Sequence, residues 1–162
     1  MGQWEGCGKS DDWHTPAFVF EALGCRFDLD VAAPIEGPRY VPCSRWISTG
    51  GLEKEWNGFV WMNPPFGGRN GLVPWLEKFF KHGCGVALVP DRTSAAWWQC
   101  FAPTADAILF VGGKIKFEKP DGTVGKNHAN GTCLMASGGR AVDALQWASR
   151  SGLGFLMKRY AA

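Results

Sequence analysis

Apolar runs alternate with helix-like stretches in the middle of the chain, and this order constrains the fold more than any other feature. Runs with the length and composition of buried strands, and stretches with helical spacing between them, are predicted in the order strand 59–62, helix 72–82, strand 86–90, a helix capped by Ser94, and strand 107–111. Such an order is typical of parallel sheets with right-handed crossovers. We therefore expect a compact α/β fold with a mostly parallel sheet.

The flanking segments carry their own start and stop signals. Thr15 is a natural N-cap and Pro16 a natural first helical residue, so a helix is expected over about 16–23 that ends at Gly24. Its buried side is predicted to comprise Phe18, Val19, Ala22 and Leu23. The remaining expected elements are strands at 27–31, 132–136 and 154–157, a helix at 140–150 and a turn at 120–123, with an irregular stretch at 35–57.

A stiff corner follows the first of the central strands. Asn63 is followed by Pro64 and Pro65, which lack N–H donors and end the strand. The carboxyl ends of strands are where open α/β sheets place their ligand sites. Asn63 is therefore expected to present its side-chain amide at a rigid corner, with Phe66 able to offer a ring face to a flat group.

The strand at 27–31 alternates strictly and carries two acidic residues. Asp28 and Asp30 are expected on the face opposite Phe27, Leu29 and Val31. One interpretation is an edge strand with a solvated acidic face. The other is that Asp28 and Asp30 accept hydrogen bonds from a ligand, either from ribose hydroxyls or from an ammonium group.

Composition bounds the class of protein. The 162 residues are enough for one domain with a core, and residues 1–12 are expected to be a loose arm. The six cysteines lie far apart without metal-ligand spacing, so reduced thiols fit better than a zinc site or disulfides. No signal peptide or membrane-length apolar run is visible, so a soluble cytoplasmic protein is expected.

The charges are unevenly distributed. Residues 1–36 carry seven acidic and two basic side chains, whereas residues 37–162 carry eight acidic and fifteen basic ones. The basic part is suited to approach a phosphate backbone, and its candidate contacts are Arg92, Lys114, Lys116 and Lys126. A plain solvated hairpin over 112–130 fits the same pattern.

Several motifs resemble a known family. Asn63 to Phe66 resembles the Asn/Asp-Pro-Pro-Tyr/Phe signature of S-adenosylmethionine (SAM) dependent methyltransferases that act on planar or amide nitrogens. In combination with it, further segments resemble the small phage-type (Dam-like) DNA N6-adenine methyltransferases, and these segments lie at 11–16, 27–33, 60–67, 87–98 and 112–117. The resemblance implies a trimmed Rossmann-like methyltransferase that is phage or prophage encoded and acts on double-stranded DNA.

The resemblance also implies roles for individual residues. The catalytic motif comprises Asn63, Pro64, Pro65 and Phe66, and the residues that hold SAM comprise His14, Thr15 and Pro16 together with Asp28 or Asp30. The implied reaction is direct methyl transfer to N6 of a flipped-out adenine on which Phe66 stacks. No metal is expected, because the methyl group already sits on a positively charged leaving group.

Two other functions stay open at this point. Similar motifs serve methylation of RNA, of a guanine amino group or of a protein glutamine. A non-catalytic nucleic-acid-binding module would use Trp97, Trp98 and the lysines as its surface. Its best support is that Ala32-Ala33-Pro34 stands where a Gly-x-Gly cofactor loop is commonly found.

Overall fold

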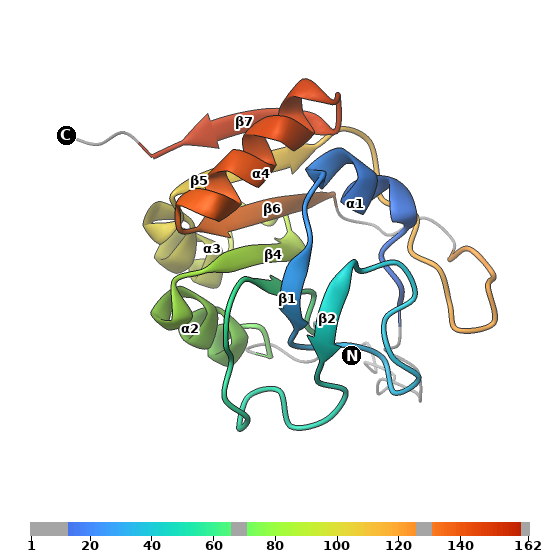
Figure 1. Ribbon diagram of the computed structural model, residues 1–162. Helices are drawn as coiled ribbons and strands as arrows, with labels where there is room; N and C mark the ends of the chain where they lie inside the picture. Colours follow the sequence, from blue (N-terminus) through green and yellow to red (C-terminus); the bar gives the residue numbers. More distant parts are fainter. Residues whose placement is uncertain (1–12, 66–70, 126–130, 160–162) are drawn as a thin grey trace, which may run out of the picture.

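A seven-stranded sheet forms the centre of the molecule in the computed structural model, which describes residues 13–65, 71–125 and 131–159 (Figure 1). In chain order, the elements are α1 (Ala17–Leu23), β1 (Phe27–Asp30), β2 (Cys43–Trp46), β3 (Val60–Met62), α2 (Val73–His82), β4 (Gly85–Pro90), α3 (Ala96–Phe101), a 3₁₀ turn (Ala102–Thr104), β5 (Ala107–Val111), β6 (Thr132–Ser137), α4 (Gly139–Arg150) and β7 (Gly154–Lys158).

The strand order is β2-β1-β3-β4-β6-β5-β7. The pairings β2–β1, β1–β3 and β3–β4 are parallel, whereas β4–β6, β6–β5 and β5–β7 are antiparallel and longer. The expectation of a mostly parallel sheet is therefore wrong. The reason is that β6 returns from the far end of the chain and inserts between β4 and β5, so these two strands point the same way but are not neighbours.

Helices cover both faces of the sheet (Figure 1). Side chains of α1 and α4 belong to one buried cluster, together with Phe59 and Trp61. Side chains of α2 and α3 belong to a second cluster, together with Val60 and Met62. Because successive side chains of a strand point to opposite faces, the two clusters lie on opposite sides of β3. Burial on both sides explains why this strand reads as a continuous apolar run.

The predicted C-terminal ends of α1 and α2 are confirmed, but the predicted N-caps of α1 and α3 are wrong. Gly24 and Gly83 end α1 and α2 in the left-handed conformation, as predicted. The predicted caps are wrong: Pro16 occupies the N-cap of α1 and Ala95 that of α3, and neither helix has a side-chain cap bond. Phe18 is exposed, so its predicted burial is also wrong.

One segment contains more structure than expected, and another forms a hairpin around the turn predicted at 120–123. The stretch 35–57, expected to be irregular, includes β2. This strand lies at the edge of the sheet and pairs with β1 through its backbone, and its side chains do not alternate between buried and exposed. Residues 117–125 form a narrow hairpin through a bridge between Glu118 and Val124. In the described part of the chain, no helix is both long and apolar enough to cross a bilayer.

Candidate active site

The Asn63 corner leaves the sheet directly after β3. Asn63 is half-buried, Pro64 is buried and Pro65 is exposed, while Phe66 lies outside the described residues. Because β1, β2 and β3 are parallel, their carboxyl ends meet at the same edge of the sheet. The structure thus places Asn63 at the edge where ligand sites of such sheets are found.

The segment 14–16 is distant from Asn63 in the sequence, but Thr15 contacts Asn63 at this corner. The Asn63 side-chain Nδ2 donates a hydrogen bond to Thr15 Oγ1 at 3.1 Å. His14 and Thr15 are each only 4% exposed. The backbone N–H of His14 donates to the Glu118 carbonyl at 2.8 Å, and the Glu118 N–H returns a bond to the His14 carbonyl at 3.0 Å. The corner is therefore joined to the hairpin through residues 14 and 15.

Asp30 is a buried carboxylate at the carboxyl end of β1. It is 3% exposed and accepts one hydrogen bond, from the Ala32 N–H at 3.1 Å. Burial raises the pKa of Asp30 to about 7, and the Ala32 bond lowers it only in part. Asp30 pairs in register with Trp61 of the neighbouring strand β3, so these two side chains lie on the same face of the sheet. Asn63 follows Trp61 by two residues, directly after β3 ends.

Asp28 has a different environment. Its Oδ2 accepts the Phe59 N–H at 2.7 Å and lies 3.7 Å from the Arg140 guanidinium. Phe59 precedes β3, so this contact lies at the amino end of the strand, opposite the Asn63 corner. Asp28 thus organises the entry into β3. Since β1 lies between β2 and β3, the edge-strand interpretation of the two aspartates is wrong.

Trp46 is a site candidate that sequence reasoning did not single out. It pairs in register with Asp30 and is 53% exposed. Its ring lies so close to Gly37 that a Cβ at this glycine would stand 3.3 Å from the nearest ring atom. A large exposed ring beside a buried carboxylate offers a stacking face. The signal available in the sequence was a tryptophan in an otherwise polar strand.

Three of the four predicted basic residues lie in the described part of the chain, where they are exposed but lie on different segments. Arg92 follows the carboxyl end of β4, and Lys114 and Lys116 flank the buried Ile115 on the segment that leads to the hairpin. Lys126 lies outside the described residues. The structure brings the lysine-bearing segment near the Asn63 corner through the His14–Glu118 pairing.

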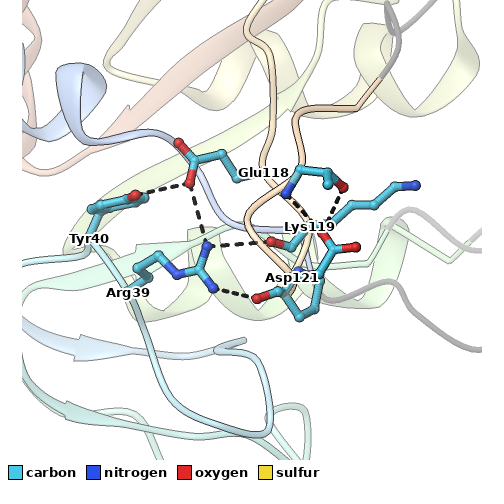
Figure 2. Close-up of polar contacts among 7 residues, drawn as sticks. Arg39, Tyr40, Glu118, Lys119 and Asp121 are labelled. Atoms are coloured by element: carbon cyan, nitrogen blue, oxygen red, sulfur yellow. Dashed lines mark hydrogen bonds and ion pairs between the residues drawn. The ribbon is translucent and has the colours of Figure 1, made fainter.

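A polar network fixes the hairpin to the loop before β2 (Figure 2). The Arg39 guanidinium donates to the backbone carbonyls of Lys119, at 3.4 Å, and Pro120, at 2.6 Å, and lies 3.5 Å from the Glu118 carboxylate. Tyr40 Oη donates to the same carboxylate at 2.9 Å. The turn itself is closed by Asp121, which accepts bonds from Thr123.

The described ranges contain no group of His, Cys, Asp and Glu side chains that could hold a metal ion. The corner provides three polar groups. They are the half-buried side-chain amide of Asn63, whose oxygen is available, the backbone carbonyl of Pro64, which precedes a proline without an N–H, and the buried carboxylate of Asp30. Such groups position and polarise a substrate and do not attack it.

Comparison with known proteins gives one match. A model of the DNA N-6-adenine-methyltransferase (Dam) family matches residues 7–143, which include every site residue described above. Searches among curated proteins and among solved structures gave no match. The resemblance read from the motifs is thereby confirmed, and because the match covers well over half of the chain, the protein belongs to the DNA N-6-adenine-methyltransferase (Dam) family.

Proposed function

We propose that this protein transfers a methyl group from SAM to the N6 amino group of adenine in double-stranded DNA. Membership in the family implies adenine methylation and a DNA substrate. The single observation that supports the placement of the chemistry is the Asn63 corner at the end of β3, with its amide nitrogen bound to Thr15.

The hydrogen-bond acceptors at the corner are suited to activate the amino group of adenine. The adenine amino group is a poor nucleophile because its lone pair is delocalised into the ring. Asn63 Oδ1 and the Pro64 carbonyl are two acceptors for the two N–H bonds of that group, and accepting both favours a more pyramidal nitrogen. The acceptors are held by a proline-stiffened turn, so they need little reorganisation during the reaction.

The residues around Asp30 fit the cofactor. When bound, SAM supplies an electrophilic methyl group on a positively charged sulfur. Asp30 has acceptor capacity beyond its single backbone bond and suits a hydroxyl or ammonium donor. The exposed ring of Trp46 offers a stacking face next to it. Asp28 is not part of this proposal, because its carboxylate is engaged with Phe59 at the other end of the sheet.

The target base must leave the helix to reach Asn63, because N6 of a paired adenine is engaged inside the duplex. Phe66, directly beyond the two prolines, is the residue we propose to stack on the flipped base. Arg92, Lys114 and Lys116 supply positive charge for the phosphate backbone. The binding-module alternative loses one of its two stacking rings, since Trp98 is 5% exposed and belongs to the core, whereas Trp97 is half-buried.

A product analysis tests the reaction. Purified protein is incubated with methyl-labelled SAM and, in parallel reactions, with unmethylated double-stranded DNA, with RNA or with a protein acceptor, and the nucleic acids are digested to nucleosides. We expect label in N6-methyldeoxyadenosine, reduced by about 100-fold or more in Asn63→Ala. Asn57→Ala, which removes an exposed amide far from the corner, is the matched control and retains activity. Label found only in RNA, in another base or in protein would refute the proposed substrate.

Binding of DNA is tested separately from chemistry. Lys116→Glu is expected to weaken DNA binding and to reduce the dependence of log K on log salt by about one. Lys81→Glu makes the same charge change on α2 and serves as the control. Equal effects of both variants would mean that Lys116 acts only through net charge.

A further inference from the structure

The hydroxyl of Thr15 is not used by the helix that follows it. The N-cap of α1 is Pro16, and the helix has no side-chain cap bond. Thr15 Oγ1 instead accepts the Asn63 Nδ2–H at 3.1 Å, across 48 positions of sequence. Because the threonine is 4% exposed, little water competes for this bond.

Thr15 is held from both sides. The backbone of His14 makes two bonds to Glu118, at 2.8 and 3.0 Å. Pro16 has its φ locked by its ring, at −67°, and its carbonyl accepts the Val19 N–H at 3.2 Å. The β-branched side chain of threonine further restricts its first torsion angle. The acceptor that faces Asn63 therefore has a set position.

The two ends of an asparagine amide are not equivalent towards an amino group. The oxygen accepts the N–H bonds of the substrate, whereas the NH₂ end presents two donors to another donor. Thr15 Oγ1 engages the NH₂ end, which turns Oδ1 away from Thr15. Because a hydroxyl both donates and accepts, Thr15 would also bond a rotated amide, so this bond fixes the place of the Asn63 side chain and not which of its ends faces the substrate.

We infer that Thr15 is a positioning residue that holds the side-chain amide of Asn63 in place at the corner. This inference rests on the proposed function. It assigns to Thr15 a role different from the cofactor contact that the sequence resemblance implies. The two roles differ in what they predict for the turnover rate and for the affinity for SAM.

The test compares Thr15→Val, which keeps the shape and removes the acceptor, with Thr15→Ser, which keeps the hydroxyl. We expect Thr15→Val to lower kcat at saturating SAM and DNA about tenfold. Its dissociation constant for SAM, measured by titration calorimetry, should stay within about twofold of that of the unmodified protein. Thr15→Ser should recover most of kcat. Thermal unfolding of all variants identifies any that fold poorly.

A second background separates an effect through Asn63 from general support of the fold. In Asn63→Ala, no amide remains for Thr15 to hold. Adding Thr15→Val should then change kcat by less than about twofold. An equal loss in both backgrounds would overturn the inference. If the alanine variant is inactive, the comparison of kcat with SAM affinity decides alone.

The outcomes also separate this inference from the proposed function. Thr15→Val with weaker SAM binding and an unchanged saturated kcat would make Thr15 a cofactor ligand and overturn the positioning role. An active unmodified protein with an unaffected Thr15→Val variant overturns only the positioning role. If the unmodified protein methylates no adenine, both fall.

Discussion

Removing the charge of Asp30 is expected to stabilise the protein and to abolish its affinity for SAM. Asp30 is 3% exposed and has one hydrogen bond, so its ionised form lacks the solvation that it has in the unfolded chain. Asp30→Asn keeps the shape and the acceptor for the Ala32 N–H but removes the buried charge.

The expected magnitude follows from the pKa of Asp30, which burial raises from an ordinary 3.8 to about 7. Below pH 3.8 both states are protonated. Between pH 3.8 and about 7 the unfolded chain releases this proton and the folded protein keeps it, so the free energy of unfolding falls as the pH rises. The total loss is about 4 kcal/mol and is complete above pH 7.

Urea unfolding from pH 4 to pH 9 measures this effect. The stability of Asp30→Asn relative to the unmodified protein should rise through pH 4–7 and then level off, at about 4 kcal/mol. Asp143→Asn removes an exposed carboxylate on α4 and controls for the loss of one negative charge. Parallel stability profiles for Asp30→Asn and the unmodified protein would refute the reasoning.

Addition of SAM should narrow the difference in stability between the two proteins. A ligand present at 100 times its dissociation constant stabilises the folded state by about 2.7 kcal/mol. We expect this gain at pH 8 for the unmodified protein and not for Asp30→Asn, because the proposed donor of the cofactor finds no carboxylate in the variant. Equal stabilisation of both proteins would remove Asp30 from the cofactor site.

Two further predictions concern the parts that support the site. Arg39→Ala should loosen the hairpin and raise the hydrogen-exchange rate of the Gly125 amide, which donates to Phe117, several-fold at constant global stability; an unchanged rate would show that the network in Figure 2 does not hold the hairpin. Gly58→Ala should cost about 3 kcal/mol in urea unfolding, because its Cβ would stand 2.5 Å from the Asp28 carboxylate at a φ of +82°, whereas Gly113→Ala, with a φ of +73° and open space, should cost about 1 kcal/mol. Equal costs at the two glycines would mean that the Asp28 contact relaxes freely.

Local patterns predicted most of the elements. Buried runs such as 86–90 and glycine stops such as Gly83 act over a few residues, so the sequence shows them directly. The strand order was not predictable in this way. The insertion of β6 between β4 and β5 depends on contacts between residues far apart in the chain, and the β4–α3–β5 pattern looks the same whether or not another strand enters between them.

Some site residues were likewise predictable from the sequence, and others were not. The Asn63 corner was predictable, because the prolines dictate the local backbone and the signature is a contiguous run. The choice between Asp28 and Asp30 was not, since both lie in one alternating strand and differ only in what packs around each end of it. Trp46 was missed for the same reason: its value as a candidate comes from its pairing with Asp30.

The sequence by itself thus determined the family, the α/β composition and the residues at the corner, because each is written in adjacent positions. Only the tertiary structure decided the mixed sheet, the burial that shifts the pKa of Asp30, and the bond from Asn63 to Thr15. The physical reason is that these features depend on contacts between residues that lie more than 20 positions apart in the chain, and the hydroxyl of Thr15 suits a helix cap as well as it suits an amide. Packing of segment 14–16 against the hairpin selects the amide.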